Sequence, residues 1–374
     1  MRSKRELMRF IKLPWRLYRN EPHWVPPLIS ERKRHLDREH NPFFQHAEAE
    51  YFLAWRDGQP VGRISAHVDH RLNEVHGTNW GLFGFFESEE NFETPHALLS
   101  AAEAWLRERG KDTMVGPMDF TTNHECGLLV EGFERRPQIL ENWHHPYYAA
   151  MIEAYGLSKA MDLLKWELHI SDREKMLPVL FELAEKVEPE HGVHVRPMRK
   201  RDFHNEVRSF MEVYNSAWEK NWAFVPLSDA ELETYAKELK PILDENWAWI
   251  AEKNGEVVGA ALTIPDYNQI LRRVNGRLLP FGWLHFLRAR QEIDSVRVFA
   301  LGVKPEYQHT GVAAKFYVEH FNSASRTPQH WGEMGWILES NTAMNRGMEA
   351  MNGRIVKRYR VYEKALGEGR PIER

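Results

Sequence analysis

One turn of the sequence has residue types that suit the binding of an anion: Gln308, His309, Thr310, Gly311, Val312 and Ala313. It follows an apolar run at residues 296–303, which is typical of a strand, and it leads into a segment typical of a helix. The first backbone N–H groups of a helix have no partners within the helix, so together they attract a negative charge. Gly311 lets the backbone approach a ligand closely. The turn therefore predicts a pyrophosphate site, with a plain tight connection as the alternative.

The size and composition of the chain limit what surrounds this turn. At 374 residues the chain is longer than one hydrophobic core usually serves, so two domains are expected. The net charge of −4 gives no overall attraction to nucleic acid, and no nucleic-acid partner is expected. The single cysteine, Cys126, excludes an intrachain disulfide and a thiolate metal cluster, which favours a reducing cytoplasm. No metal site is predicted.

The two halves of the chain repeat one pattern. Asp57-Gly58 and Asn254-Gly255 each supply the pair of residues that a two-residue type I′ turn needs, and apolar strands flank both turns. After each hairpin the sequence continues with a loop, a strand, a helix and another strand. In the first half, Thr94 is expected to cap that helix. The repeat predicts domains at residues 1–190 and 191–374.

The residues around the turn resemble the acyl-CoA motif of the GCN5-related N-acetyltransferase (GNAT) superfamily, whose pattern is Arg or Gln, two residues, Gly, one residue, then Gly or Ala. They are Val303, Pro305, Tyr307, Gln308, Gly311, Val312 and Ala313. The resemblance covers residues 193 to about 365 and implies an α/β (α+β) fold of tandem GNAT-like domains, each with a mixed, mostly antiparallel sheet flanked by helices. Glu87, Glu89 and Glu90 stand where the first half would have its phosphate turn. The first half is therefore expected to be a degenerate copy, with one CoA site in the second half.

The resemblance also implies positions for the co-substrate, acetyl-CoA or a longer acyl-CoA. The backbone of Leu301 and Val303 would pair with the pantetheine amides, and residues 308–313 would hold the pyrophosphate. Asn341 and Asn345 match the next motif of the family, in which an Asn side chain touches the cofactor. Many members place a Tyr seven residues after that Asn to protonate the leaving thiolate, but Met348 stands here.

Three residues are candidates for proton transfer. Attack on a thioester requires a neutral amine, so a base must take its proton. Glu339 is the first candidate because it ends a core strand beside the expected thioester, and Asp294, at the entry to the cofactor strand, is the second. A solvated strand-end carboxylate is the alternative for both. Tyr362 on the final strand is a substitute acid, unless it serves only packing.

The sequence leaves the amine acceptor open. A long segment, residues 264–293, combines apolar residues with five arginines, which suits a long acyl chain or a membrane interface. A lid over the cleft is the alternative. The basic residues of the first helix are expected on the outer face of a helix that packs on its own domain, and contact with an anionic membrane is the alternative. Two-copy bacterial members of the superfamily include enzymes that move a long acyl chain to a sphingoid amine.

These observations predict an acyl-CoA-dependent N-acyltransferase that moves an acyl group to an amine, with a lipid or sphingoid amine as one possibility. The alternatives are a FemABX-like aminoacyltransferase, which takes its acyl group from charged tRNA and needs no phosphate turn, and a non-catalytic module that binds acyl-CoA. The expected location is the cytoplasm, with or without peripheral contact to the inner face of the membrane.

Overall fold

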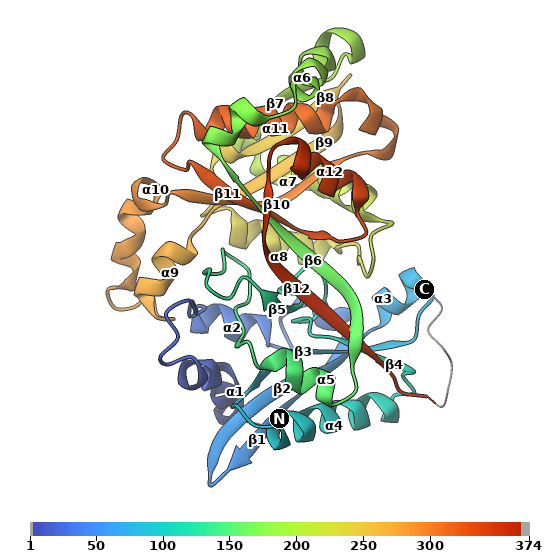
Figure 1. Ribbon diagram of the computed structural model, residues 1–374, viewed down its shortest axis with the longest axis vertical. Helices are drawn as coiled ribbons and strands as arrows, with labels where there is room; N and C mark the ends of the chain where they lie inside the picture. Colours follow the sequence, from blue (N-terminus) through green and yellow to red (C-terminus); the bar gives the residue numbers. More distant parts are fainter. Residues whose placement is uncertain (1–2, 368–374) are drawn as a thin grey trace.

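The computed structural model describes residues 3–367 (Figure 1). The strands are β1 (Ala47–Arg56), β2 (Gln59–Asp69), β3 (Trp80–Ser88), β4 (Thr113–Gly116), β5 (Leu128–Glu131), β6 (Ser158–His169), β7 (His194–Pro197), β8 (Ala248–Lys253), β9 (Glu256–Pro265), β10 (Ser295–Val303), β11 (Trp331–Leu338) and β12 (Arg354–Ala365). The α-helices are α1 (Lys4–Leu17), α2 (Ile29–His35), α3 (His70–His76), α4 (Glu93–Glu108), α5 (Tyr148–Ala154), α6 (Pro178–His191), α7 (Phe203–Trp218), α8 (Asp229–Leu239), α9 (Asn268–Val274), α10 (Ala289–Glu292), α11 (Val312–Ala324) and α12 (Thr342–Ala350).

The described strands form one continuous sheet. Its order is β1-β2-β3-β4-β12-β6-β11-β10-β9-β8-β7, with β5 beside β12. The pairs β3–β4 and β10–β11 are parallel, and the other pairs of named strands are antiparallel. In Figure 1 the sheet runs along the molecule, with α4 and α5 at one end and α6, α11 and α12 near the other. This mixed, mostly antiparallel sheet flanked by helices confirms the predicted fold class.

Each half contains the predicted hairpin, β1–β2 in the first half and β8–β9 in the second. Asp57 and Gly58 have φ angles of 48° and 73°, and Asn254 and Gly255 have 52° and 83°, as a type I′ turn requires. A helix and a parallel strand follow each hairpin, α4 with β4 and α11 with β11. The internal repeat is therefore a repeat of structure as well as of sequence.

Two strands cross between the halves. β6 belongs to the first half in sequence but pairs with β11 of the second half. β12 ends the second half but pairs with β4 and β5 of the first half, and β6 and β12 also pair with each other. The boundary predicted near residue 190 falls at the end of α6 and stays a prediction, because strand pairing joins the chain on both sides of it.

The first two long helices of the chain pack on the first half. α1 buries Phe10 and Ile11 in a core cluster with Phe43 and Phe120, while its basic residues face outward.

The prediction for the cap of α4 was wrong by a few residues. The helix begins at Glu93, and the side chain of Asn91 accepts a hydrogen bond of 2.8 Å from the N–H of Thr94.

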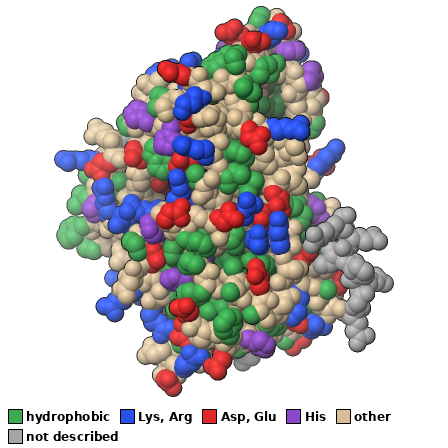
Figure 2. Space-filling model, in the orientation of Figure 1, with side chains coloured by type: hydrophobic (Ala, Val, Ile, Leu, Met, Phe, Trp, Pro, Cys, Tyr) green, Lys and Arg blue, Asp and Glu red, His purple; other side chains and the backbone are tan. Residues whose placement is uncertain are grey.

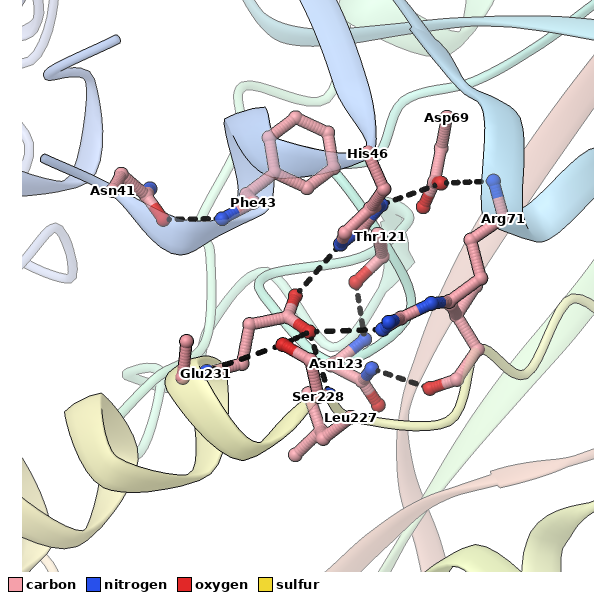
Figure 3. A network of polar contacts seen from close by, with 12 residues as sticks. Asn41, Phe43, His46, Asp69, Arg71, Thr121, Asn123, Leu227, Ser228 and Glu231 are labelled. Carbon is pink, nitrogen blue, oxygen red and sulfur yellow. Dashed lines mark hydrogen bonds and ion pairs between the residues drawn. The ribbon is translucent and has the colours of Figure 1, made fainter. Parts of the chain in front are cut away.

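A polar network holds the start of α8 against the first half (Figure 3). His46 lies between two carboxylates, with Nδ1 2.9 Å from Asp69 Oδ1 and Nε2 3.2 Å from Glu231 Oε1. Arg71 pairs with Glu231 at 3.2 Å, and Asn123 donates to the carbonyl of residue 225 at 2.9 Å. Burial would lower the pKa of His46, but its hydrogen bonds to Asp69 and Glu231 raise the pKa to about 9. The imidazolium is thus a charged link between the halves at neutral pH.

We expect this link to stabilise the fold only while His46 is protonated. Because its pKa is raised in the folded protein, the contribution is complete below about pH 6.5 and is lost as the pH rises through about 9. His46→Phe should cost about 2 kcal/mol near pH 6, the usual contribution of a hydrogen bond to a charged group. Thermal unfolding of both proteins across this pH range measures the difference, which should shrink toward high pH.

His40→Phe is the matched control, since His40 is exposed and its ion pair is with Asp37, three residues away on the same segment. It should leave the unfolding midpoint unchanged at every pH. A His46→Phe deficit that stays constant with pH would show that the link is not ionic.

Candidate active site

The sheet opens between β10 and β11. The two strands pair only from Ser295 to Val298, opposite Trp331 to Met334. β11 then bulges at Gly335, whose φ is 93°, and among the described residues it makes no further pairs with β10. β10 continues to pair with β9 on its other edge as far as Val303. The free edge predicted for the cofactor strand is therefore present at residues 299–303.

A cavity of about 800 Å³ fills this split. It includes five of the residues predicted to contact the co-substrate, namely Leu301, Val303, Gln308, Ala313 and Asn341. Tryptophan, methionine and phenylalanine side chains from α11, β11, α12 and the segment after α7 supply much of the remaining wall. The volume lies within the usual range of roughly 300–1,000 Å³ for small-molecule sites.

The predicted phosphate turn contains a short 3₁₀ helix, η6 (Pro305–Thr310), which the sequence did not indicate. Gly311 follows with a φ of 82°, and α11 begins at Val312. A side chain at Gly311 would also meet the carbonyl of Leu183 on α6, with a Cβ only 2.8 Å from that oxygen. The glycine is therefore required by the turn and by the packing of α6, whatever binds in front of it.

Only part of the turn faces the cavity. Gln308 and Ala313 line it, and Gln308 donates to the carbonyl of Val303 at 3.3 Å. Thr310 is buried and donates to the carbonyl of Tyr307 at 2.6 Å. Val312 is buried in a core cluster, while His309 is exposed. The structure brings Gln308 and Ala313 to the split and places Val312 and Thr310 behind them.

The two predicted asparagines have different surroundings. Asn341 lines the cavity, and its side chain caps α12 by accepting a hydrogen bond of 3.1 Å from the N–H of Met344. The Asn345 amide accepts from Trp166 Nε1 at 3.0 Å and donates to the carbonyl of Leu338 at 3.0 Å. Asn345 therefore fastens α12 to the end of β11.

The three candidates for proton transfer lie outside the described lining of the cavity. Glu339 pairs with Lys159 at 2.7 Å, and Asp294 accepts a hydrogen bond of 2.9 Å from Gln269. Tyr362 is buried in the core of the first half, where burial raises its pKa and its hydroxyl donates to Glu153 at 3.1 Å. The geometry does not bring these three side chains together.

Sequence reasoning missed several cavity residues. Trp218 and Trp222 follow the amphipathic stretch of α7, and their aromatic clustering in SAWEKNWAF was the available signal. Tyr317 of α11 is the phenol among the described lining residues, and burial raises its pKa to about 12. Its hydroxyl lies 3.0 Å from where a Cβ on Gly347 would stand, next to Met348. A phenol therefore reaches the region where the family places its tyrosine, but from another helix.

A buried ionic cluster lies where β11 leaves β10. It joins β6, β10, β11 and β12 to the loop before α5 through Lys165, Arg297, Glu333, Lys357 and Glu141. All five side chains are nearly inaccessible to solvent.

The contacts of the cluster keep its side chains charged and hold the bulge of β11 in place. Lys357 Nζ lies 2.7 Å from Glu333 Oε2, and Lys165 Nζ donates to the carbonyl of Gly335 at 2.6 Å. Burial alone would raise the pKa of Glu141, but Lys165, Lys357 and Arg297 lower it to about 2. The cluster therefore holds the carbonyl at which the split begins.

A group of possible metal ligands lies in the first half of the protein, not at the cavity in the split. Asp37, Glu39 and His40 are the group of described residues whose ligand atoms lie close enough together to hold an ion, and they sit at the surface of the first half.

Among the described helices, none has the length and apolar character needed to cross a membrane.

The sheet with its split strands has the fold of tandem GNAT proteins. The structure is similar to a tandem GNAT protein from the clavulanic acid biosynthesis pathway, with a TM-score of 0.58, 10% identity, and coverage of 99% of this chain and 97% of that one. It is also similar to a GCN5-related glucosamine N-acetyltransferase region of a fungal multi-domain protein, with a TM-score of 0.56 and 13% identity over 97% of this chain and 37% of that one. No family model matches the chain.

Comparison of sequences finds relatives of higher identity than these structures. It is 37% identical to the bacterial ceramide synthase of Caulobacter vibrioides, over 98% of this chain and 96% of that protein. It is 35% identical to protein YghO of Escherichia coli, over 97% and 94% of the two chains. The chain belongs to the family of the bacterial ceramide synthase. It is an acyl-CoA-dependent N-acyltransferase, as the sequence predicted.

We expect Ala313→Asp to weaken CoA binding by roughly 10- to 100-fold, because it adds a negative charge beside the predicted pyrophosphate position. An acidic residue in the first turn suits the helix dipole, so α11 should still fold. Calorimetry with CoA measures the affinity.

His204→Asp is the matched control, since His204 is the exposed second residue of α7, as Ala313 is the second residue of α11. It should bind CoA like the unaltered protein. Equal affinities for Ala313→Asp and His204→Asp would place the phosphates elsewhere.

Proposed function

We propose that this N-acyltransferase moves a long acyl chain from CoA to the amine of a single-chain lipid, such as a sphingoid amine. The name of the relative from Caulobacter vibrioides supports the class of acceptor. The apolar continuation of the cavity beyond the split is the observation that supports a long acyl chain.

That continuation lies on the α11 side of the sheet. Past the split, the cavity is lined by Val296 and Val298 of β10, by Phe321 and Ala324 of α11, and by Trp247. Val296, Ala324 and Trp247 belong to one small core cluster, so packed apolar side chains form part of this end, beside the polar His320 and Gln329. Alkyl chains gain most from such surroundings, at about 0.8 kcal/mol for each buried CH₂ group.

The proposed path for the co-substrate follows from the same lining. The pyrophosphate lies at Gln308 and Ala313, and the pantetheine runs along the free edge of β10 past Val303 and Leu301. The thioester then reaches the bulge at Phe299, where an extra residue interrupts the pairing of β10 with β9. Backbone N–H groups released by a bulge are suitable donors to the developing oxyanion.

Proton transfer in this proposal uses a residue that the sequence did not indicate. Tyr317 donates its phenolic proton to the departing thiolate, because it lines the cavity beside Met344 and stays protonated at neutral pH with a pKa of about 12. Glu339 and Asp294 remain proposed bases that act through water, since their side chains are fixed at strand ends outside the cavity wall.

The protein should form N-acylated product and release free CoA when it is given a long-chain acyl-CoA with a sphingoid amine. Ala324→Leu should move the preferred acyl chain to shorter lengths, because the larger side chain fills space beside Val296 and Trp247. Each CH₂ group that no longer fits should cost roughly 4-fold in kcat/KM. Thiol release and mass spectrometry across a series of acyl chain lengths measure both effects.

Ala343→Leu is the matched control, because Ala343 lines the same cavity on α12, near the predicted CoA end at Asn341. It should lower activity for all chain lengths alike. A preference for acetyl-CoA in the unaltered protein, or no shift with Ala324→Leu, would contradict the long-chain assignment.

We propose in addition that the protein contacts an anionic membrane through the segment from α9 to η5 (Gly282–Arg288). Leu279, Phe281 and Leu287 are 77%, 72% and 71% exposed there. Residues 267–291 contain five arginines and no acidic residue. Figure 2 shows hydrophobic and basic side chains together at the edge where Figure 1 places α9 and α10. Apolar tips with flanking arginines suit an anionic lipid surface.

Replacing Leu279, Phe281 and Leu287 by serine should abolish flotation with vesicles that contain phosphatidylglycerol. The exposed residues Phe92, Leu177 and Val179 offer a matched triple serine control of similar hydrophobic loss. That control should float like the unaltered protein. Equal flotation of both triple variants would exclude this segment as the membrane contact.

A further inference from the structure

A second cavity, of about 340 Å³, lies between the two halves. We call it the interdomain chamber. The first half contributes α2 and the loop at residues 122–125, and the second half contributes α7, α8 and the segment between them. Five residues line both this chamber and the cavity in the split, namely Trp218, Asn221, Trp222, Phe299 and Trp336. The two spaces therefore meet at the bulge of β10.

The alternation of side chains along β10 puts the two spaces on opposite faces of the sheet. Val296 and Val298 line the cavity under α11, whereas Arg297 lines the chamber, and Phe299 lies where the two meet. Neighbouring residues of a strand point to opposite faces, so the split is the passage between them. A thioester carbon at Phe299 can then be reached from the chamber while the acyl chain stays on the other face.

The wall that the first half supplies can accept hydrogen bonds. The rings of His35 and His124 meet edge to face with their centroids 4.8 Å apart, and the Nε2 atom of His35 is buried without a hydrogen-bond partner among the described residues. Burial lowers the pKa of both histidines, that of His124 to about 4, so both are neutral. Arg32 is held by Glu31 and Glu125, each at 2.6 Å, and anchors α2 to the loop.

The wall that the second half supplies is mainly aromatic. Tyr214, Trp218, Trp222 and Tyr235 lie on or between α7 and α8. A ligand that fills the chamber thus meets hydrogen-bond acceptors on one side and apolar rings on the other. These are the surroundings that an amine with hydroxyl or keto groups and an attached alkyl chain requires.

We propose that the interdomain chamber binds the amine acceptor and delivers its nitrogen to the thioester through the split, with His35 Nε2 accepting a hydrogen bond from the ammonium or from a neighbouring hydroxyl. The first half, which lacks a phosphate turn, then builds the acceptor site. This inference rests on the proposed function only in taking the acceptor to be an alkyl amine.

His35→Phe tests the hydrogen bond, because a phenyl ring keeps the contacts of His35 with Phe85 and Phe120 but has no nitrogen to accept a hydrogen bond. The KM for the amine should rise by about 10- to 100-fold, the effect of losing one hydrogen bond to a charged group. The KM and the binding constant for acyl-CoA should not change. His96→Phe is the matched control, since His96 is an exposed histidine of α4 whose ring meets Tyr155 edge to face, and it should leave both KM values unchanged.

Thr234→Trp tests the chamber without touching its buried wall. Thr234 is exposed on α8 and lines the chamber, so the larger ring narrows the space while the core is left intact. It should raise the KM for the amine and leave acyl-CoA binding unchanged. An unchanged amine KM in both His35→Phe and Thr234→Trp, or equal rises in the KM values of the two substrates, would overturn the proposal.

An alkyl amine that carries a diazirine locates the acceptor independently of turnover. After irradiation, labelled peptides that contain residues 31–35 or 122–125 would support the chamber, and labelling confined to other segments would overturn it. If no amine is acylated but the chamber is labelled, the proposed reaction fails while the binding site stands. If amines are acylated but the label lies elsewhere, the reaction stands and the chamber does not.

Discussion

The buried ion cluster at the start of the split is the constraint on which the rest of the structure depends. Moving charges out of water is costly, and pairing offsets that cost only when the geometry is tight. Glu141 therefore has to stay with Lys165, Arg297 and Lys357, which lie on three different strands. Lys165 and Arg297 also donate to the carbonyl of Gly335, at 2.6 and 3.3 Å. The same contacts that satisfy the charges thus fix the point at which β11 leaves β10.

Strand exchange explains why the two halves form one working unit. Because β6 and β12 cross between the halves and pair with each other, neither half can complete its sheet alone. The ion pairs of His46 and Arg71 with Glu231 add contacts between the halves. Both cavities are therefore lined by elements that hold a fixed relation, which a site shared between two substrates requires.

Local features of this fold could be predicted from the sequence, and long-range ones could not. The turns at Asp57-Gly58 and Asn254-Gly255 depend on two residues each, so their sequence was enough. The catalytic candidates depend on which strands become neighbours. Tyr362 stands on the last strand of the second half, yet that strand pairs with β4, which places the phenol in the core of the first half. β6 reached the site by pairing with β11 of the other half, and Trp218 and Trp222 reached it from the end of α7; no local pattern shows either arrangement.

The sheet also separates an apolar binding region from a polar one, and a single pocket could not provide both. Along β6, Leu164, Trp166 and Leu168 pack under α11, whereas Lys165 and Glu167 point to the opposite face and its ion pairs. An acyl chain gains from the dry face, and a charged amine would lose its hydration there without compensation. Polar side chains on the opposite face can form hydrogen bonds or ion pairs with that amine until it reaches the thioester. A split in the sheet, rather than a groove on one face, is therefore the geometry that suits an apolar donor and a cationic acceptor together.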